Sequence, residues 1–189
     1  MHPCKTTHAM PPFPRLLIVS GNGRNSGKTT LITRIIREFR EKQHITGIKI
    51  SPHFHPVPES YPLLQRAENW ALYREDGKAR ATDSARMLHA GAREVFYVQA
   101  YDQGIPGALD ALRNHIDRES LWVCESGGLP QFVKPGILVL TSLKGRHGEK
   151  PAFRDLINHA DIVTQFDGRH FTPNPLSKLK PQKNQWVAR

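Results

Sequence analysis

A glycine-rich segment between an apolar run and a helical pattern constrains this chain more than any other feature. Residues 16–19 read Leu-Leu-Ile-Val, and residues 21–30 follow as Gly-Asn-Gly-Arg-Asn-Ser-Gly-Lys-Thr-Thr. A buried strand, a loop of small residues and a helix in this order bring backbone N–H groups and a helix N-terminus to one point, where they can bind phosphate oxygens. The sequence therefore predicts a phosphate-binding loop at the start of an α/β fold.

The loop also carries the side chains that phosphate chemistry needs. We expect the Lys28 amine to bind the β- and γ-phosphates and the Thr29 hydroxyl to ligate Mg²⁺. The usual spacing, Gly-x-x-x-x-Gly-Lys-[Ser/Thr], places its first glycine at position 22, where this chain has Asn22. Asparagine tolerates the left-handed backbone region better than most residues, so we expect the turn to survive. The predicted nucleotide-binding residues of the loop are Asn22, Gly23, Arg24, Asn25, Ser26, Gly27, Lys28, Thr29 and Thr30.

Apolar runs and helical patterns alternate along the rest of the chain. The runs predict strands at 16–19, 45–50, 94–98, 121–124, 136–141 and 162–164, and the helical spacing predicts helices at 31–41, 83–90, 108–116 and 152–159. Strands that are apolar throughout and alternate with helices indicate a mostly parallel central sheet with helices on both faces. The proline-bearing stretch 51–82 has weak periodicity, and one interpretation places a short helix at 63–73.

The carboxyl ends of the predicted strands bring further candidates together, because ligands of parallel sheets bind at that edge. Glu125 ends an apolar strand, where an acid can hold Mg²⁺ through water or orient a water for attack on a phosphate. We therefore predict Lys28 and Glu125 as the catalytic residues, and Thr29 and Glu125 as the metal ligands. Lys49 ends another strand at the same edge, where its charge can meet a phosphate.

Two histidines near this edge are interpreted as surface residues and not as metal ligands. His53 and His55 lie between prolines, and no third metal ligand is near them in the sequence, so we interpret them as surface loop residues.

Length and charge limit the class of protein. A chain of 189 residues predicts one domain at 15–166, with a loose N-terminal lead at 1–14 and a basic, disordered tail at 167–189. The net charge of +10 favours polyanionic partners, a nucleotide among them, although aromatic and basic residues do not interleave as in a surface that binds single-stranded nucleic acid. No apolar stretch predicts a membrane span, and two cysteines are too few for a disulfide framework, so we expect a cytoplasmic protein.

Several of these segments together resemble the molybdopterin-guanine dinucleotide biosynthesis protein B (MobB) family. Residues 25–31, Asn-Ser-Gly-Lys-Thr-Thr-Leu, are similar to that family's phosphate-binding loop. Residues 47–49, Gly-Ile-Lys, with His53 beyond them, are similar to its second strand and the histidine-bearing loop that follows. The most specific match is residues 83–92, Asp-Ser-Ala-Arg-Met-Leu-His-Ala-Gly-Ala, which resemble the family's Asp-Ser-x-Arg-x-x-x-Ala-Gly-Ala segment.

The resemblance implies a P-loop NTPase architecture that binds GTP with Mg²⁺ and hydrolyses it slowly. It also implies an accessory role beside the nucleotidyltransferase that joins a guanine nucleotide to molybdopterin. Proteins of this family often form homodimers, so the resemblance implies a homodimer as well. By resemblance, Lys49, Asp83 and Arg86 join the nucleotide or cofactor site.

The chain departs from the family in ways that leave other functions open. Asn22 replaces a glycine, and residues 125–128, Glu-Ser-Gly-Gly, are closer to the Glu-x-Gly-Gly of P-loop ligases such as dethiobiotin synthetase. The sequence has no Asn-Lys-x-Asp motif for guanine, so GTP and ATP both remain candidates. One alternative is a P-loop kinase or ligase that acts on a small metabolite. A third hypothesis, ranked last, is a basic nucleic-acid-binding module with a vestigial loop, which predicts salt-sensitive binding.

Overall fold

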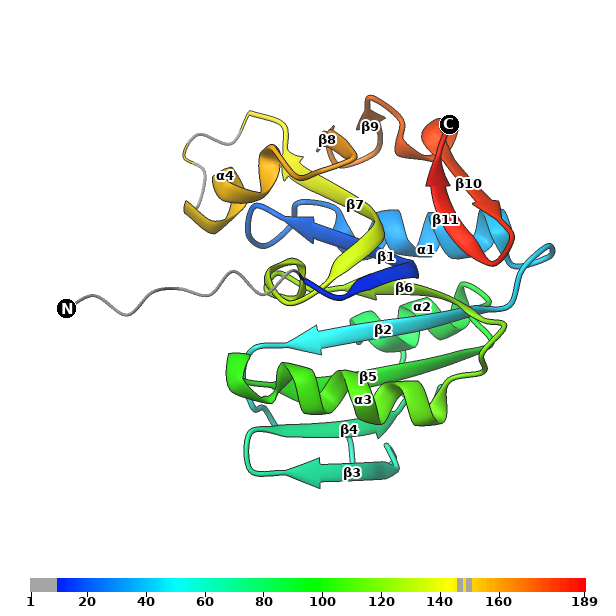
Figure 1. Ribbon diagram of the computed structural model, residues 1–189, viewed down its shortest axis with the longest axis vertical. Coiled ribbons are helices and arrows are strands. Elements are labelled where there is room, and N and C mark those ends of the chain that lie inside the picture. Colours follow the sequence, from blue (N-terminus) through cyan, green and yellow to red (C-terminus); the bar gives the residue numbers. More distant parts are fainter. Residues whose placement is uncertain (1–9, 146–147, 149–150) are drawn as a thin grey trace.

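A computed structural model describes residues 10–145, 148 and 151–189 of the chain (Figure 1). The described strands are β1 (Pro12–Gly21), β2 (Ile45–Ser51), β3 (Leu63–Ala67), β4 (Trp70–Arg74), β5 (Glu94–Ala100), β6 (Leu121–Glu125), β7 (Lys134–Leu143), β8 (Ile162–Phe166), β9 (Phe171–Thr172), β10 (Leu179–Gln182) and β11 (Gln185–Ala188). The described α-helices are α1 (Lys28–Phe39), α2 (Asp83–His89), α3 (Ile105–His115) and α4 (Pro151–Ile157).

The strands form a mixed, mostly parallel sheet. Within the described residues, nine strands pair in the order β3-β4-β5-β2-β6-β1-β7-β8-β9, and β10 and β11 form a separate hairpin. The run from β5 to β8 is parallel, whereas β3, β4 and β9 pair antiparallel at the two edges. The prediction of an α/β fold with a mostly parallel sheet is therefore confirmed.

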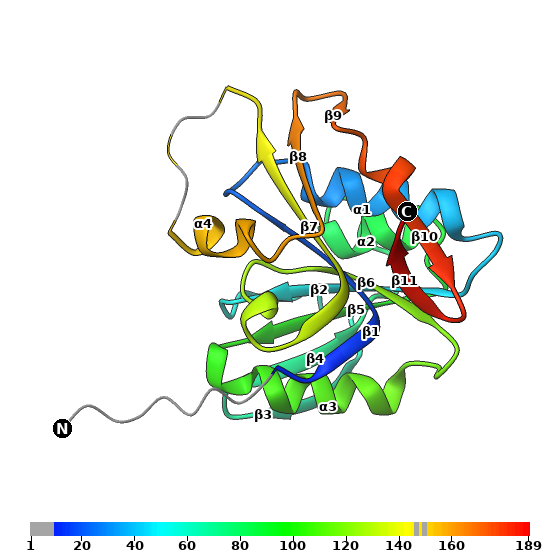
Figure 2. The same ribbon diagram turned by 45° about the horizontal axis from the view of Figure 1, so that its top comes forward.

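The helices cover both faces of this sheet, as predicted. On β1, the fully buried Leu16 and Ile18 pack in one core with residues of α3 and α4. Their neighbours Leu17 and Val19 pack in the other core, with residues of α1 and α2. Figure 2 shows α1 and α2 on one side of the sheet and α3 on the other. Because successive side chains of a strand point to opposite faces, a strand that is apolar throughout needs cover on both sides.

Residues 63–73 form a hairpin, so the interpretation of a short helix there was wrong. The four residues of β4 from Trp70 to Tyr73 are all buried, because β4 pairs with β5 and is packed on both faces. The outer strand β3 is mostly exposed, as its polar residues require at an edge. The segment forms a strand because β4 pairs with β5, which lies more than twenty residues further along the chain.

The C-terminal residues are ordered, which corrects the expectation of a disordered tail at 167–189. The segment forms β9, the hairpin β10–β11 and a short 3₁₀ turn at Pro175–Lys178. Trp186 is only 2% exposed, its indole N–H donates to the carbonyl of Trp122 over 3.0 Å, and its ring meets Phe39 edge-on. The basic residues of the segment lie between a few apolar side chains that are buried in the core. Burial of these apolar side chains stabilises the segment more than repulsion between its basic residues destabilises it.

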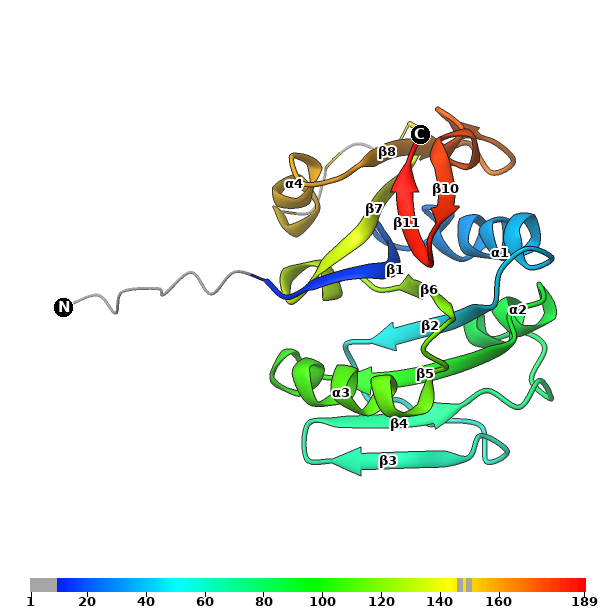
Figure 3. The same ribbon diagram turned by 45° about the vertical axis from the view of Figure 1, so that its right-hand side comes forward.

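The hairpin β10–β11 lies beside the first strand of the chain, near α1 (Figure 3). At the other end, residues 12–14 of the predicted N-terminal lead belong to β1, and residues 1–9 lie outside the described part. In the described part of the chain, no helix is both long and apolar enough to span a membrane.

Candidate functional site

The glycine-rich loop, residues 21–28, connects the carboxyl end of β1 to the first turn of α1. Its curvature comes from positive φ angles at Gly23 (87°), Asn25 (61°) and Gly27 (84°). Gly27 is the N-cap of α1, and a Cβ at this position would lie 2.7 Å from the ring of Phe166. Both its backbone conformation and the available space therefore require glycine.

Asn22 does not lie in the left-handed region, so the expected reason for its tolerance was wrong. The residue is 2% exposed, and its backbone N–H donates to the carbonyl of Thr141 over 3.0 Å. Its side-chain amide donates to the carbonyl of Gly148 over 3.2 Å. Asn22 thus links the loop to β7 and to Gly148, and its backbone conformation does not require glycine.

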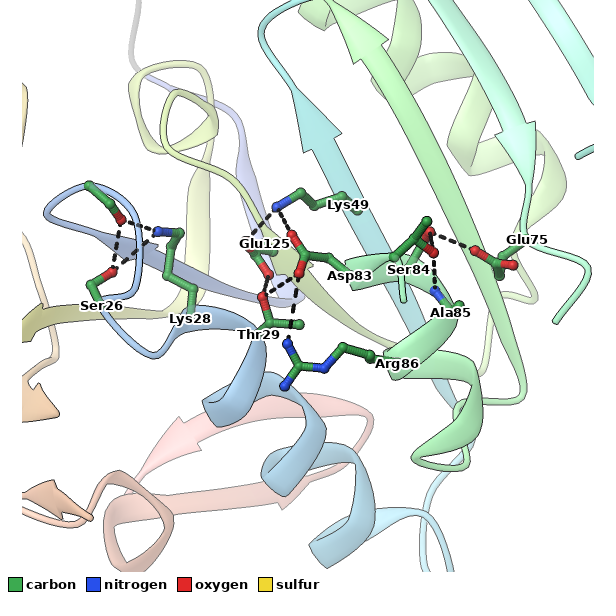
Figure 4. Close-up of polar contacts among 12 residues, drawn as sticks. Ser26, Lys28, Thr29, Lys49, Glu75, Asp83, Ser84, Ala85, Arg86 and Glu125 are labelled. Atoms are coloured by element: carbon green, nitrogen blue, oxygen red, sulfur yellow. Dashed lines mark hydrogen bonds and ion pairs between the residues drawn. The ribbon is translucent and has the colours of Figure 1, made fainter. Parts of the chain in front are cut away.

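The amine of Lys28 lies across the loop. It donates to the Gly23 carbonyl over 2.6 Å and to the Ser26 hydroxyl over 3.2 Å, as Figure 4 shows for Ser26 and Lys28. No side chain caps the first turn of α1, because its N-cap is glycine. A first helical turn carries backbone N–H groups without intrahelical partners and a partial positive charge, so this end of α1 favours an anion. Arg24 and Asn25 are exposed at the tip of the loop.

Next to the loop, four side chains form a polar cluster: Thr29, Lys49, Asp83 and Glu125 (Figure 4). The Thr29 hydroxyl lies 2.7 Å from one Glu125 oxygen and 3.0 Å from one Asp83 oxygen. The Lys49 amine donates to the remaining oxygen of each carboxylate, over 2.5 Å to Glu125 and 2.7 Å to Asp83. The structure thus brings together four residues that the sequence analysis had predicted separately.

Strand register and a helix cap place these four side chains. Lys49 and Glu125 are direct partners in the parallel pair β2–β6, so both project from the same face at the carboxyl ends of their strands. The hydroxyl of Thr82 accepts the backbone N–H of Ala85 and caps α2, which starts at Asp83.

Lys49 and Asp83 stay charged although both are partly buried. Burial alone would lower the pKa of Lys49, but the adjacent carboxylates of Glu125 and Asp83 outweigh burial and raise it. Burial would raise the pKa of Asp83, but Lys49 at hydrogen-bond distance lowers it. Arg86, one turn further along α2, lies 3.9 Å from Asp83 and adds a weaker attraction. Lys49 and Asp83 are therefore both charged at neutral pH.

The oxygen atoms of the cluster suit a hard divalent cation. Mg²⁺ prefers carboxylate, hydroxyl, water and phosphate oxygens, and it usually takes only one or two carboxylates from the protein. Thr29, Asp83 and Glu125 offer that set beside the loop. Within the described residues, no three His, Cys, Asp or Glu side chains are grouped as an all-protein metal site. His53 and His55 are exposed, as expected for surface loop residues.

A second network behind α2 was missed in the sequence analysis. Tyr61, Glu75 and Ser84 are all buried, and the hydroxyls of Tyr61 and Ser84 both contact the Glu75 carboxylate. Tyr61 and Glu75 lie in the stretch with weak periodicity, so no sequence pattern pointed to them. Ser84 was noted only as part of the resemblance to the MobB segment.

A cavity of about 610 Å³ lies at the opposite, amino-terminal end of the parallel strands. Two of the arginines that line it pair with acids at the surface, Arg74 with Glu94 over 2.8 Å and Arg93 with Asp117 over 3.4 Å. It contains none of the predicted site residues.

Comparison with protein-family models, with curated proteins and with solved structures found no match to this chain. The geometry of the loop and of the polar cluster is therefore what supports a function.

Proposed function

We propose that this chain is a Mg²⁺-dependent nucleotide-binding protein of P-loop NTPase architecture, with GTP favoured over ATP. One observation carries the proposal: the Thr29 hydroxyl, one residue after the loop lysine, lies within hydrogen-bond distance of the Glu125 and Asp83 carboxylates. A hydroxyl and a carboxylate from the end of a neighbouring strand are the protein groups that hold Mg²⁺ beside a nucleotide triphosphate in such proteins.

Each residue has a distinct part in this proposal. The Lys28 amine leaves the Gly23 carbonyl and binds the β- and γ-phosphates, while loop N–H groups and the start of α1 hold phosphate oxygens. Thr29 and Glu125 would hold Mg²⁺, with the Asp83 carboxylate beside them, and the ion would supply positive charge against the negative charge that develops on the phosphates.

We also propose that nucleotide hydrolysis is slow. Both oxygens of Glu125 already accept hydrogen bonds, one from Lys49 and one from Thr29. The carboxylate is therefore better placed to hold an ion or its water than to take a proton from an attacking water.

The proposed cellular role is that of a MobB-like accessory protein in the synthesis of molybdopterin guanine dinucleotide. The resemblance rests on residues 25–31, 47–49 and 83–92, which are far apart in the sequence. Thr29, Lys49 and Asp83 belong to these three segments, and all three meet in one cluster. Parallel strands by themselves bring the first two segments to one edge of the sheet, and the contacts of Asp83 with Thr29 and Lys49 add the third segment, which supports the role.

Calorimetric titration of non-hydrolysable GTP and ATP analogues, with and without Mg²⁺, tests the proposal. We expect Mg²⁺-dependent binding to the wild type and a loss of at least about tenfold in affinity in Lys28→Ala. Lys42→Ala removes the same charge from an exposed position after α1 and is expected to bind like the wild type. Equal binding by the Lys28 variant, or no binding by the wild type, would contradict the proposal.

The residues after Glu125 keep a kinase or ligase as the second candidate. Residues 126–128 read Ser-Gly-Gly, and a Cβ on Gly127 would meet no atom within 4 Å, so the backbone that follows the Glu125 carboxylate is open. Such an enzyme turns over rapidly only when its acceptor is added. Steady hydrolysis without an acceptor, and no phosphorylated product from a metabolite mixture, would count against it.

A further inference from the structure

A buried carboxylate lies behind the start of α2, on the side away from the glycine-rich loop (Figure 4). Glu75, one residue past β4, is 5% exposed. One of its oxygens accepts hydrogen bonds from the Tyr61 hydroxyl and, over 2.6 Å, from the Ser84 hydroxyl. The other oxygen accepts the backbone N–H of Gly77 over 3.1 Å. An unpaired carboxylate is costly to bury, and these donors satisfy it.

The network continues into the cap of α2. The Thr82 hydroxyl accepts the N–H of Ala85 over 3.1 Å, so its own proton is available for Tyr61, whose oxygen lies 2.9 Å away. Burial, together with the hydrogen bond to Glu75, raises the pKa of Tyr61, and the phenol remains a donor. The hydrogen bonds thus run in one direction, from Thr82 to Tyr61 to Glu75.

Asp83 stands between two residues that this network holds. Thr82 and Ser84 both contact Tyr61 or Glu75, whereas the Asp83 side chain points the other way, to Thr29 and Lys49. Helix α2 has only seven residues, and so short a helix is not stable by itself. The first turn of α2 is therefore stabilised by the hydrogen bonds that Thr82 and Ser84 make with their surroundings.

We propose that Tyr61, Glu75 and Ser84 are positioning residues that aim Asp83 at the metal site, so that the proposed Mg²⁺ affinity depends on a network that never touches the ion. This inference rests on the proposed function and names further residues of the same site. It assigns a role to the segment between β2 and α2, for which the sequence analysis gave none.

Two buried tyrosines provide a matched test. Tyr61 and Tyr73 are 5% and 7% exposed and pack in the same small apolar cluster. The Tyr61 hydroxyl joins the network, whereas the Tyr73 hydroxyl accepts a hydrogen bond from Arg66 over 2.9 Å. Tyr61→Phe and Tyr73→Phe each remove one hydroxyl from one buried ring, so a difference between them reports the network and not lost packing.

The first measurement is amide hydrogen exchange in the nucleotide-free protein. The N–H groups of Ala85 and Arg86 are bonded to Thr82, so they report the first turn of α2 directly. We expect both to exchange about three- to tenfold faster in Tyr61→Phe than in Tyr73→Phe. Ser84→Ala is the second variant and is expected to act in the same direction.

The second measurement is Mn²⁺ affinity, followed by electron paramagnetic resonance, at saturating nucleotide analogue. We expect Tyr61→Phe to weaken Mn²⁺ binding about three- to tenfold and to leave nucleotide affinity without metal unchanged. Tyr73→Phe is expected to match the wild type in both. Equal exchange and equal Mn²⁺ affinity in the two tyrosine variants would overturn the inference. If the wild type binds no metal–nucleotide complex, the proposed function fails, and the exchange result still shows whether the network holds the helix.

Discussion

Replacement of Lys49 by methionine tests the polar cluster most directly. The Lys49 amine is the cation that both carboxylates share, 2.5 Å from Glu125 and 2.7 Å from Asp83. Methionine keeps a long apolar stem and removes the charge. Two carboxylates would then face each other across Thr29 without a cation between them. We expect the variant to fold with reduced stability and to respond more strongly than the wild type to divalent cations.

The burial of each partner sets the size of the loss. The Glu125 side chain is 3% exposed, and removal of one partner from a buried ion pair costs about 3–5 kcal/mol. The Asp83 side chain is 39% exposed, so its pair with Lys49 adds only about 0–1 kcal/mol. Lys49 keeps a fifth of its own side-chain surface in solvent, and this favours the low end of the first range. We therefore expect a loss of about 3 kcal/mol in the free energy of unfolding.

Urea unfolding without divalent cations measures this loss, with Lys49→Arg as the control that keeps the charge. We expect the arginine variant to lose less than half as much as the methionine variant. Addition of Mg²⁺ at about 10 mM should stabilise Lys49→Met by at least about 1 kcal/mol more than the wild type, because the ion replaces the missing cation. A loss below about 1 kcal/mol, or equal losses in the two variants, would refute the reasoning.

The pH dependence supplies a second check of the same cluster. Lys49 lowers the pKa of Asp83 below 3.8, so this pair stabilises the wild type above that pH and the contribution is lost as Asp83 protonates. The pKa of Lys49 is raised above 10.5, so loss of its proton weakens the pair only in strong alkali. Lys49→Met lacks this pair. The difference in the free energy of unfolding between wild type and variant should therefore shrink as the pH falls below 3.8 and Asp83 takes up its proton.

Three further changes test other parts of the structure. Gly27→Ala places a Cβ 2.7 Å from the Phe166 ring at a φ of 84°, so we expect a loss of about 2 kcal/mol or more in urea unfolding. Trp186→Ala removes a buried ring and its hydrogen bond to Trp122, with an expected cost of about 3–5 kcal/mol, and an unchanged midpoint would show that the hairpin is dispensable. Glu125→Gln should weaken Mg²⁺ binding at saturating nucleotide about tenfold while metal-free nucleotide affinity, measured by calorimetry, stays the same.

The central strands and the loop were predictable because their signals are local. The runs at 16–19 and 121–124 are apolar throughout, and such runs belong to strands covered on both faces. The loop can be recognised from its own glycines and from the helical pattern that follows it. That Lys49 and Glu125 lie at the same edge was also predictable, because the carboxyl ends of parallel strands share an edge. That the two residues are direct partners was not predictable, because the register between two strands is not encoded in either strand alone.

Segments whose structure depends on distant partners were missed. The sequence around Trp70 suggested a short helix, but pairing with β5 makes this segment a strand. Trp186 was predicted to lie in a polar tail, but its contacts with Phe39 and Trp122 place it in the core. The same limit hid Glu75, whose hydroxyl donors come from residues on either side of it in the chain. Hydrogen bonds between loops leave no periodic trace in a sequence.

The hairpin β10–β11 has a consequence for how the chain is made. Trp186 belongs to the same core as Leu17 and Val19 of β1, which a ribosome delivers about 170 residues earlier. During synthesis, that face of β1 lacks part of its cover until the hairpin emerges. An incompletely covered apolar strand is a target for chaperones and a starting point for aggregation. We therefore expect nascent chains arrested before residue 179 to remain chaperone-bound, and release to follow the appearance of Trp186.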